Sequence, residues 1–323
     1  MTTLKNDSRS LNEEQYTNSS VYHNKIKQSQ MKKWVNIILF FSIVLSFETD
    51  AKSDELKEMS VYARRNLPEK HFFIQGKQLY GGGRAESIGR RHTMEDSSCI
   101  IGEFAGKNTQ LYGLFDGHGS SEPSIYVAQN IPGIILQKLK EYDGDVKKSL
   151  QSSIYEINEY AVSKWKSSGT TAAIVAIVDK KLYTANVGDS RIILIYGNKV
   201  ERLSFDHKVT DTEERKLVCD RGGVILNNRV NGVLVLSRAI GDGNLSDYIS
   251  CEPYISESDF DDNSYLIIAC DGVWDVMSDE EAAAIFMTTK NPSAAACAIK
   301  DEAIKKGSTD NITVMCVSLC PRE

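Results

Sequence analysis

Carboxylates beside glycine or other small residues recur in four short stretches of this sequence. The stretches are residues 91–96 (Arg-His-Thr-Met-Glu-Asp), 115–119 (Phe-Asp-Gly-His-Gly), 269–275 (Ala-Cys-Asp-Gly-Val-Trp-Asp) and 308–311 (Ser-Thr-Asp-Asn). Most of them follow or precede apolar, β-branched runs, so their hard oxygen ligands would gather at strand ends around divalent cations. Arg91 adds a guanidinium for a phosphate, and His118 adds an imidazole for proton transfer. The combination indicates metal-assisted attack on a phosphoryl group.

Each of these residues also has a plain structural interpretation when it is taken alone. Asp116 ends an apolar run and precedes Gly117, as a rigid metal ligand would, but Asp-Gly is also a common turn dipeptide. Arg91 has the charged neighbours Arg90 and His92, which would suit a solvated ion pair, and a histidine after Asp-Gly can be a structural donor. The order of motifs along the chain decides between these interpretations.

Seven motifs occur in a fixed order. They are Arg-x-x-Met-Glu-Asp (91–96), Phe-Asp-Gly-His-Gly (115–119), Gly-Asp-Ser-Arg (188–191), Asp-His-Lys (206–208), Ser-Arg-Ala-Ile-Gly-Asp (237–242), Cys-Asp-Gly-Val-Trp-Asp (270–275) and Asp-Asn-Ile-Thr (310–313). The series resembles that of the metal-dependent type 2C protein serine/threonine phosphatases, and the resemblance runs from residue 83 to residue 319. Ser120 stands where the family usually has a second glycine, and Val209 stands where proline commonly follows Asp-His-Lys. Neither departure removes a ligand.

The resemblance implies a centre with two Mg²⁺ or Mn²⁺ ions. In the family, the residue matching Asp116 bridges both ions, and the residue matching Gly117 lends its backbone carbonyl. Asp271 and Asp310 match further ligands, and Glu95 matches a residue that acts through a coordinated water. Two such ions lower the pKa of a bridging water and stabilise the in-line transition state. Direct attack by that water needs no cysteine or serine nucleophile.

Three more carboxylates are expected near this centre. Asp96 is expected to hold metal-bound water or the loop that carries Arg91. Asp275 and Asp206 resemble the family's weaker third-metal site, although either would equally suit an N-cap or a surface position. Residues 188–191 and 237–242 are expected to be structural, fixing turns and buried charge pairs beside the site.

The implied activity is hydrolysis of phosphoserine and phosphothreonine in proteins. Arg91 would bind the phosphate with its planar fork, and His118 would act as general acid for the leaving oxygen. One alternative is a catalytically weak pseudophosphatase that serves as a regulatory binding module, but no bridging ligand is lost here. A metal-dependent nuclease would fit the carboxylates, but it does not fit the net charge of −6, because binding a phosphate backbone needs a basic face.

The partners implied by the resemblance are phosphoprotein substrates and not nucleic acid, and the composition is that of a globular protein. The 323 residues suffice for one large or two small domains, 41% are hydrophobic, and the protein is expected to be a monomer. Seven cysteines form no CxxC pair and no zinc-like spacing, and several lie in apolar segments. Buried free thiols, and hence a reducing compartment, are the favoured interpretation.

The N-terminal residues 1–75 are expected to be a tail with a linker, and residues 76–320 the catalytic domain. Residues 1–33 are polar and show no sustained hydrophobic periodicity, which is typical of disorder. Residues 34–47 form an apolar run shorter than the roughly 20 residues of a membrane span but suited to the core of a signal peptide. A signal peptide, a membrane anchor and a tail helix packed on the domain all remain open. Cytoplasmic, membrane-associated and secretory locations therefore remain open too.

The remaining sequence alternates strand and helix patterns. Strands are expected at residues 111–115, 171–179, 181–187, 192–196, 233–236, 265–270 and 312–319, where short apolar runs end at Gly, Asn or Asp. Helices are expected at residues 122–141, 145–166, 210–221 and 278–287. Runs of strands with inserted helix pairs predict an α+β fold. The family fold implied by the resemblance is two packed antiparallel β-sheets flanked by pairs of helices.

Overall fold

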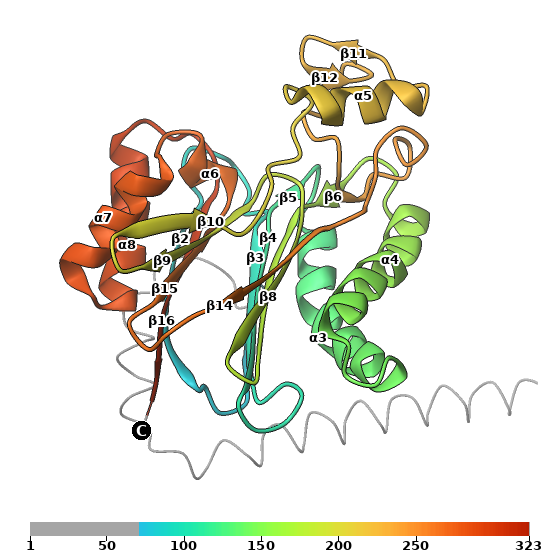
Figure 1. Ribbon diagram of the computed structural model, residues 1–323. Helices are drawn as coiled ribbons and strands as arrows, with labels where there is room; N and C mark the ends of the chain where they lie inside the picture. Colours follow the sequence, from blue (N-terminus) through green and yellow to red (C-terminus); the bar gives the residue numbers. More distant parts are fainter. Residues whose placement is uncertain (1–70, 323) are drawn as a thin grey trace, which may run out of the picture. The chain divides into compact units, whose positions relative to one another are not determined.

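Two packed β-sheets form the centre of the protein. The computed structural model describes residues 71–322, and Figure 1 shows the sheets between helices. The first sheet has the strand order β1-β3-β4-β7-β8-β14, and the second has the order β10-β9-β15-β16-β2. The bounds of the first are Phe72–Gln75, Ser97–Gly102, Thr109–Phe115, Ala172–Val178, Lys181–Val187 and Tyr254–Asp259. Those of the second are Lys199–Arg202, Arg191–Tyr196, Tyr265–Ala269, Ile312–Pro321 and Tyr80–Ser87.

Successive side chains of the central strands point alternately into the core between the two sheets and into a core beneath the outer helices. In β4, Tyr112 and Leu114 pack between the two sheets, whereas Leu111 and Phe115 pack against the helices outside. The strands β7, β15 and β16 divide their residues in the same way. Because both faces are buried, these strands consist almost entirely of apolar residues.

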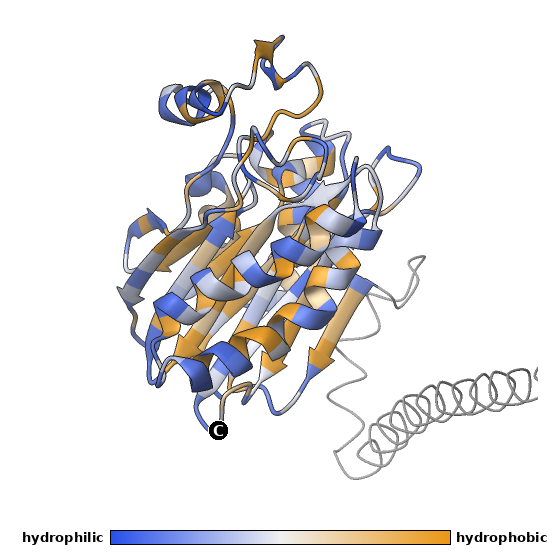
Figure 2. Ribbon diagram, turned by 90° about the vertical axis from the view of Figure 1, so that its right-hand side faces the viewer, coloured by the Kyte–Doolittle hydropathy of each residue, from blue (hydrophilic) through white to orange (hydrophobic). Residues whose placement is uncertain are grey.

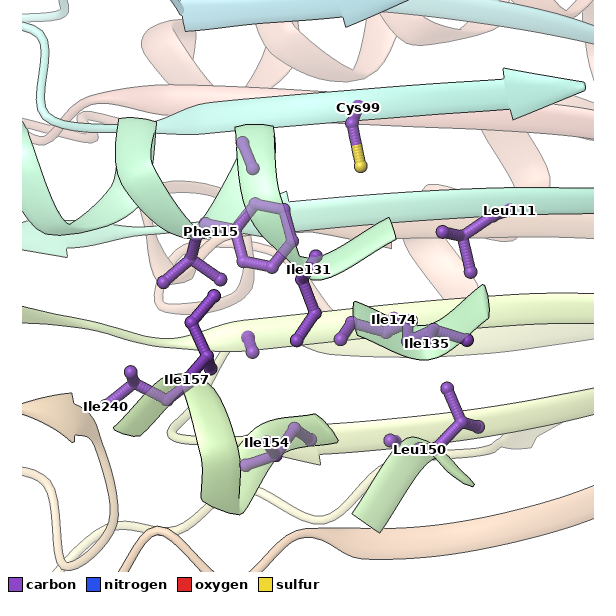
Figure 3. Close-up of a cluster of buried hydrophobic side chains, with 14 of the residues drawn as sticks. Cys99, Leu111, Phe115, Ile131, Ile135, Leu150, Ile154, Ile157, Ile174 and Ile240 are labelled. Carbon is purple, nitrogen blue, oxygen red and sulfur yellow. The ribbon is translucent and has the colours of Figure 1, made fainter. Parts of the chain in front are cut away.

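Two pairs of helices cover the outer faces of the sandwich. The first sheet carries α3 (Glu122–Glu141) and α4 (Val146–Lys164), and the second carries α7 (Asp279–Thr289) and α8 (Pro292–Lys305). Figure 2 shows largely hydrophobic strands behind α3 and α4, and hydrophilic and hydrophobic residues alternate along the visible side of these helices. The close-up in Figure 3 shows Ile131 of α3 and Ile154 of α4 in the same core as Phe115.

A smaller unit stands at one edge of the sandwich (Figure 1). It contains α5 (Thr212–Asp220) and the short hairpin of β11 (Ile225–Leu226) and β12 (Arg229–Val230). A separate small core holds it together, made of Val209, Val218, Val230, Leu234, Leu236, Ala239 and Ile249. Below it, a three-stranded sheet has the order β13-β6-β5, with bounds Ile240–Gly241, Gly169–Thr170 and Gly117–His118.

The expected α+β sandwich is confirmed, and most of the expected elements are present. The helix 122–141 has the predicted bounds, and the predicted capping box joins Ser278 to Glu281 at the start of α7. Several details differ. The pair β1 and β3 is parallel, and residues 233–236 make only isolated bridges. The helix α8 and the strands β1, β2, β3, β10 and β14 were not anticipated. Residues 233–236 belong to the small unit, where Leu234 bridges Val230 of β12 and Leu236 bridges Lys208, each only once.

All seven cysteines are free, of which Cys99, Cys270 and Cys316 are buried and Cys219 and Cys320 exposed. The predictions for residues 1–33 and 34–47 concern a part of the chain outside the described residues. Within residues 71–322, no helix is long and apolar enough to cross a membrane.

Candidate metal and phosphate site

The candidate ligands meet at one edge of the sandwich because of the strand directions. Both β4 and β8 run antiparallel to β7, so that each of them ends beside the start of β7. Asp116 follows β4 directly, and Asp189 follows β8. In the second sheet, β15 ends opposite the beginning of β16, which places Asp271 and Asp310 at corresponding ends. Residues that are distant in sequence are thereby assembled from both sheets.

Three of these carboxylates form a compact cluster. Asp116, Asp189 and Asp271 each offer an oxygen, and these oxygens lie within 4.8 Å of one another. Asp96 and the thiol of Cys270 form a second such group with Asp116. Carboxylate oxygens in this number suit hard divalent cations such as Mg²⁺ and Mn²⁺.

Gly117 allows the chain segments around Asp116 to approach closely. A Cβ atom at this position would lie 2.4 Å from the backbone oxygen of Glu95 and 3.0 Å from Oγ of Ser124. The side chain of Ser124 donates a hydrogen bond to the same oxygen of Glu95. Any larger residue at position 117 would therefore push the segment that carries Glu95 away from Asp116.

The carboxyl groups of the cluster have raised pKa values because they are buried close to one another. Burial raises the pKa of Asp116 well above its ordinary value, and repulsion from Asp96 and Asp271 raises it further. Burial also raises the pKa of Asp271, with repulsion from Asp189 and Asp310. The pKa of Asp96 rises to about 6, chiefly by burial, and its Oδ1 is buried without a hydrogen-bond partner. Cations would satisfy these oxygens, so the residues present fit a metal centre.

Lysine 208 partly neutralises one side of the cluster. Nζ of Lys208 lies 2.7 Å from Oδ1 of Asp275 and 3.3 Å from Oδ2 of Asp189. Burial lowers the pKa of Lys208, but attraction to Asp189 and Asp275 outweighs burial and leaves the pKa raised. An ammonium group therefore lies between the two carboxylates that flank Asp271 on this side.

Asp206 has a different environment from the one expected for a metal ligand. Arg191 binds both of its carboxylate oxygens, with Nε 3.1 Å from Oδ1 and Nη2 at Oδ2. Nη1 of Arg191 also donates to Asp279 of α7 at 2.5 Å. The carboxylate of Asp206 is thus engaged in an ion-pair network, whereas Asp189 lies in the cluster with Asp116 and Asp271.

The expectation that residues 188–191 are only structural missed Asp189. A signal was present, because Asp189 ends an apolar strand beside a glycine, as Asp116 and Asp271 do. Arg191 of the same motif does have the expected structural role in a buried charge pair.

The phosphate candidate Arg91 lies at the exposed side of the cluster. Its Nη2 is 2.5 Å from Oδ2 of Asp310, and 57% of its side chain is exposed. Glu95 accepts a hydrogen bond from Oγ1 of Thr93 at 2.8 Å. Asp96, by contrast, is fully buried and accepts from Oγ1 of Thr313 at 2.7 Å.

Asn311 fastens the loop that carries Arg91 and Glu95. Its Nδ2 donates to the carbonyls of Ile88 at 3.0 Å and Thr93 at 2.9 Å, while its Oδ1 accepts from the backbone N–H of Glu95 at 2.8 Å. These three bonds cross more than two hundred residues of sequence. The role of Asn311 was therefore not deducible from its local pattern.

His118 lies beside the cluster on β5. Nε2 of His118 is 2.6 Å from Oδ2 of Asp242, and 27% of the histidine side chain is exposed. The imidazole is therefore reachable from solvent on one side and held by a carboxylate on the other.

Comparisons with known proteins agree with this geometry. The sequence model described as "Protein phosphatase 2C" matches residues 80–312. The chain is 36% identical over 241 residues to "Protein phosphatase 2C homolog 1" of Schizosaccharomyces pombe, covering 71% of this chain and 70% of that protein. It is 38% identical over 253 residues to "Probable protein phosphatase 2C 45" of Oryza sativa subsp. japonica, covering 75% and 88%.

One solved structure of similar fold is titled "Structure of a C.elegans sex determining protein". It matches with a TM-score of 0.70 at 26% identity, covering 75% of this chain and 65% of that one. The chain thus belongs to the protein phosphatase 2C family. Metal-dependent removal of phosphate from serine and threonine of phosphoproteins is the activity of this class.

Proposed function

We propose that residues 76–320 form a catalytic domain that hydrolyses phosphoserine and phosphothreonine with Mg²⁺ or Mn²⁺ in the carboxylate cluster. The observation that carries the proposal is the convergence of Asp116, Asp189 and Asp271 within 4.8 Å of one another. Burial raises the pKa of all three, and repulsion from neighbouring carboxylates raises each of them further. Such an arrangement disfavours the folded protein unless cations occupy it, which argues for a functional origin.

The residues that would hold the two main ions are Asp116, Asp271, Asp310 and the carbonyl of Gly117. Glu95 would act through a coordinated water. When bound, the ions would activate a water nucleophile and neutralise charge on the transferred phosphoryl group. For a third, weaker position, we propose Asp189 and Asp275 together with Asp271. Lys208 already lies between the first two, so that an ion there would have to displace its ammonium group.

Arg91 is proposed to bind the phosphoryl oxygens. The ion pair with Asp310 holds the guanidinium at the rim of the cluster, and the exposed remainder of its fork faces solvent. A guanidinium can give two parallel hydrogen bonds to a phosphate, so one substrate group would be fixed beside the carboxylates.

His118 is proposed to donate a proton to the leaving seryl or threonyl oxygen. An alkoxide is a poor leaving group, so protonation lowers the barrier and raises the rate, typically by a factor of about 10² to 10⁴. Its position on β5, two residues after Asp116, brings a proton donor next to the proposed metal ligands.

The test is dephosphorylation of a phosphothreonine peptide with Mn²⁺, by the wild type and by Asp116→Asn. We expect EDTA to abolish turnover, and Asp116→Asn to lower kcat by about 10²-fold or more, as for other stabilisers of transition-state charge. Asp247→Asn, on an exposed loop, is the matched control and should leave kcat unchanged. A protein that binds Mn²⁺ and the phosphopeptide but never releases phosphate would establish the alternative of a regulatory binding module.

A further inference from the structure

Asp242 is a buried acid whose carboxylate has one recorded side-chain partner, His118. Only 4% of Asp242 is exposed, and its Oδ2 lies 2.6 Å from Nε2 of His118. The two residues are 124 positions apart in sequence. A buried carboxylate is costly unless it is paired, so this contact is the principal compensation for burying Asp242.

The small three-stranded sheet brings the two side chains together. His118 of β5 pairs with Gly169 of β6, and Gly169 pairs in turn with Gly241 of β13. Asp242 follows directly, so it stands across the middle strand from His118. A Cβ atom on Gly169 would lie 2.2 Å from Oδ2 of Asp242. The absence of a side chain at Gly169 is therefore what lets the carboxylate reach the imidazole.

The backbone of Asp242 is held in a conformation that few residue types adopt. Its φ is +49°, in the left-handed region that aspartate and asparagine tolerate better than most other side chains. Hydrogen bonds fix it there: the N–H of Asp242 donates to Ser168 at 2.9 Å, and its carbonyl accepts from Leu245 at 2.7 Å. The preceding Gly241 donates to Oδ1 of Asn158 at 3.0 Å. Such anchoring resembles the support given to a catalytic group more than a surface turn.

We infer that Asp242 is the positioning residue for His118, a role that rests on the proposed function of His118 as proton donor. The carboxylate accepts the hydrogen bond of Nε2–H and so fixes both the ring orientation and the nitrogen that faces the substrate. Because Nε2 is engaged, Nδ1 is the nitrogen that donates.

The proton transfer balances in this arrangement. In its acid form His118 carries a proton on both ring nitrogens. As water attacks phosphorus, the P–O bond to the seryl or threonyl oxygen breaks, and that oxygen takes the proton from Nδ1–H and leaves as the alcohol. The electron pair of the broken N–H bond stays on Nδ1, and Nε2–H remains bonded to Asp242 throughout. Both hydrogens of the attacking water leave with the phosphate as dihydrogen phosphate, and Nδ1 regains its proton from solvent, so that no further reactant is required.

Asp242→Asn tests this role, because asparagine keeps the size and tolerates the left-handed backbone. We expect kcat on a phosphothreonine peptide to fall about 10-fold or more, and kcat on p-nitrophenyl phosphate to change less than about 3-fold, because p-nitrophenolate leaves without a proton. The KM values and the Mn²⁺ concentration for half-maximal activity should not move. Asp247→Asn, the same change on an exposed loop nearby, should affect neither substrate.

A double-mutant cycle separates positioning from a merely structural effect. If Asp242 acts through His118, the protein with both His118→Gln and Asp242→Asn should turn over the peptide within about 2-fold of His118→Gln alone. Losses that multiply, or an Asp242→Asn protein with equal loss on both substrates, would overturn the inference and leave the role of His118 intact. Equal slowing of both substrates by His118→Gln alone would overturn the proposed proton donor, and the inference with it.

A measurement on the wild-type protein covers the case in which Asp242→Asn does not fold. In ¹⁵N-histidine NMR spectra of the full-length protein with Mg²⁺, the His118 signals are assigned by their loss in His118→Gln. The neutral ring should carry its proton on Nε2, with the downfield shift of a hydrogen-bonded N–H. A neutral ring protonated on Nδ1 would contradict the assignment of Asp242.

Discussion

At the scale of single residues, the site consists of buried carboxylates that repel one another in the absence of a cation. Asp116, Asp271 and Asp96 all have a raised pKa, because they are buried and adjacent. Removing one of these charges should therefore harm catalysis and help the folded state. Many functional sites show this opposition between activity and stability.

Asp271→Asn is expected to show both effects. Removing its charge should lower kcat with Mn²⁺ by about 10²-fold or more, because transition-state charge is less well neutralised. The metal-free variant should unfold at a higher temperature than the metal-free wild type, because burial and repulsion no longer act on this group. Thermal unfolding in EDTA and turnover in Mn²⁺ measure the two. A variant with wild-type turnover at saturating Mn²⁺ would show that Asp271 is not a ligand.

Arg91→Ala should mainly weaken substrate binding. The guanidinium would contact phosphate in both the ground state and the transition state, so its loss should raise KM more than it lowers kcat. Arg90→Ala provides the matched control on the neighbouring exposed arginine. An unchanged KM for both p-nitrophenyl phosphate and a phosphopeptide would assign the phosphate contact to another group.

At the scale of elements, strand ends position the ligands and Asn311 positions the loop that completes them. Asn311→Ala removes three partly buried hydrogen bonds to residues 88–95. Each lost hydrogen bond costs about 0.5–1.5 kcal/mol, so the unfolding temperature should fall. Activity should fall as well, since Arg91 and Glu95 lose their support. Asn263→Ala, in an exposed turn, is the control, and equal effects of the two changes would refute the special role of Asn311.

The elements themselves were largely predictable, and the reason is visible in β4 and β7. Both of their faces are buried, so apolar content alone marks them. In contrast, α8 carries many alanines, so its sequence shows little difference between a buried and an exposed face. Residues 233–236 have the composition of a strand but make only single bridges to Val230 and Lys208.

The candidate site was predictable where chemistry is local and not where it depends on a distant partner. Asp116, Gly117 and Asp271 have a local context of strand end and glycine. Asp189 shares the context of strand end and glycine, but nothing near Asp206 in sequence reveals that Arg191 binds its carboxylate. The pairing of His118 with Asp242 was hidden for the same reason, since it arises from the register of a three-stranded sheet.

At the scale of the whole molecule, metal should stabilise the protein more at neutral than at acidic pH. Folded-state pKa values above the unfolded value of about 3.9 mean that the cluster's contribution is most favourable below pH 4 and is lost as pH rises, through about 6 for Asp96 and higher for Asp116. Lowering pH from 7.5 to 5.5 therefore relieves repulsion by protonation, and protons compete with the ions.

Thermal unfolding with and without Mn²⁺ at both pH values is the measurement. An ion at 100 times its Kd adds about 2.7 kcal/mol, or roughly 5–10 °C for a protein of this size, and this increment should shrink at pH 5.5. His207, whose pKa is lowered to about 4 chiefly by burial, destabilises the protein as pH falls whether or not metal is present. The metal-induced difference therefore isolates the cluster, and equal increments at both pH values would contradict its assignment.

A protein that begins at Ser60 should keep full kcat. Both sheets, the four helices that cover them and every candidate ligand lie within residues 71–322. Turnover of p-nitrophenyl phosphate by the shortened and full-length proteins provides the comparison. Loss of activity on shortening would place part of the N-terminal residues in the fold.

The proposed metal ligands come from both sheets of the sandwich, which has a consequence for how the sheets are held together. Asp116 extends from the first sheet, whereas Asp271 and Asp310 extend from the second, so ions bound among them would link the two sheets. Without ions, repulsion among these carboxylates would weaken this edge of the sandwich more than the opposite one. We therefore expect amide hydrogen exchange at the starts of β7 and β16 to slow as cations bind, which would make it a direct measure of cation occupancy.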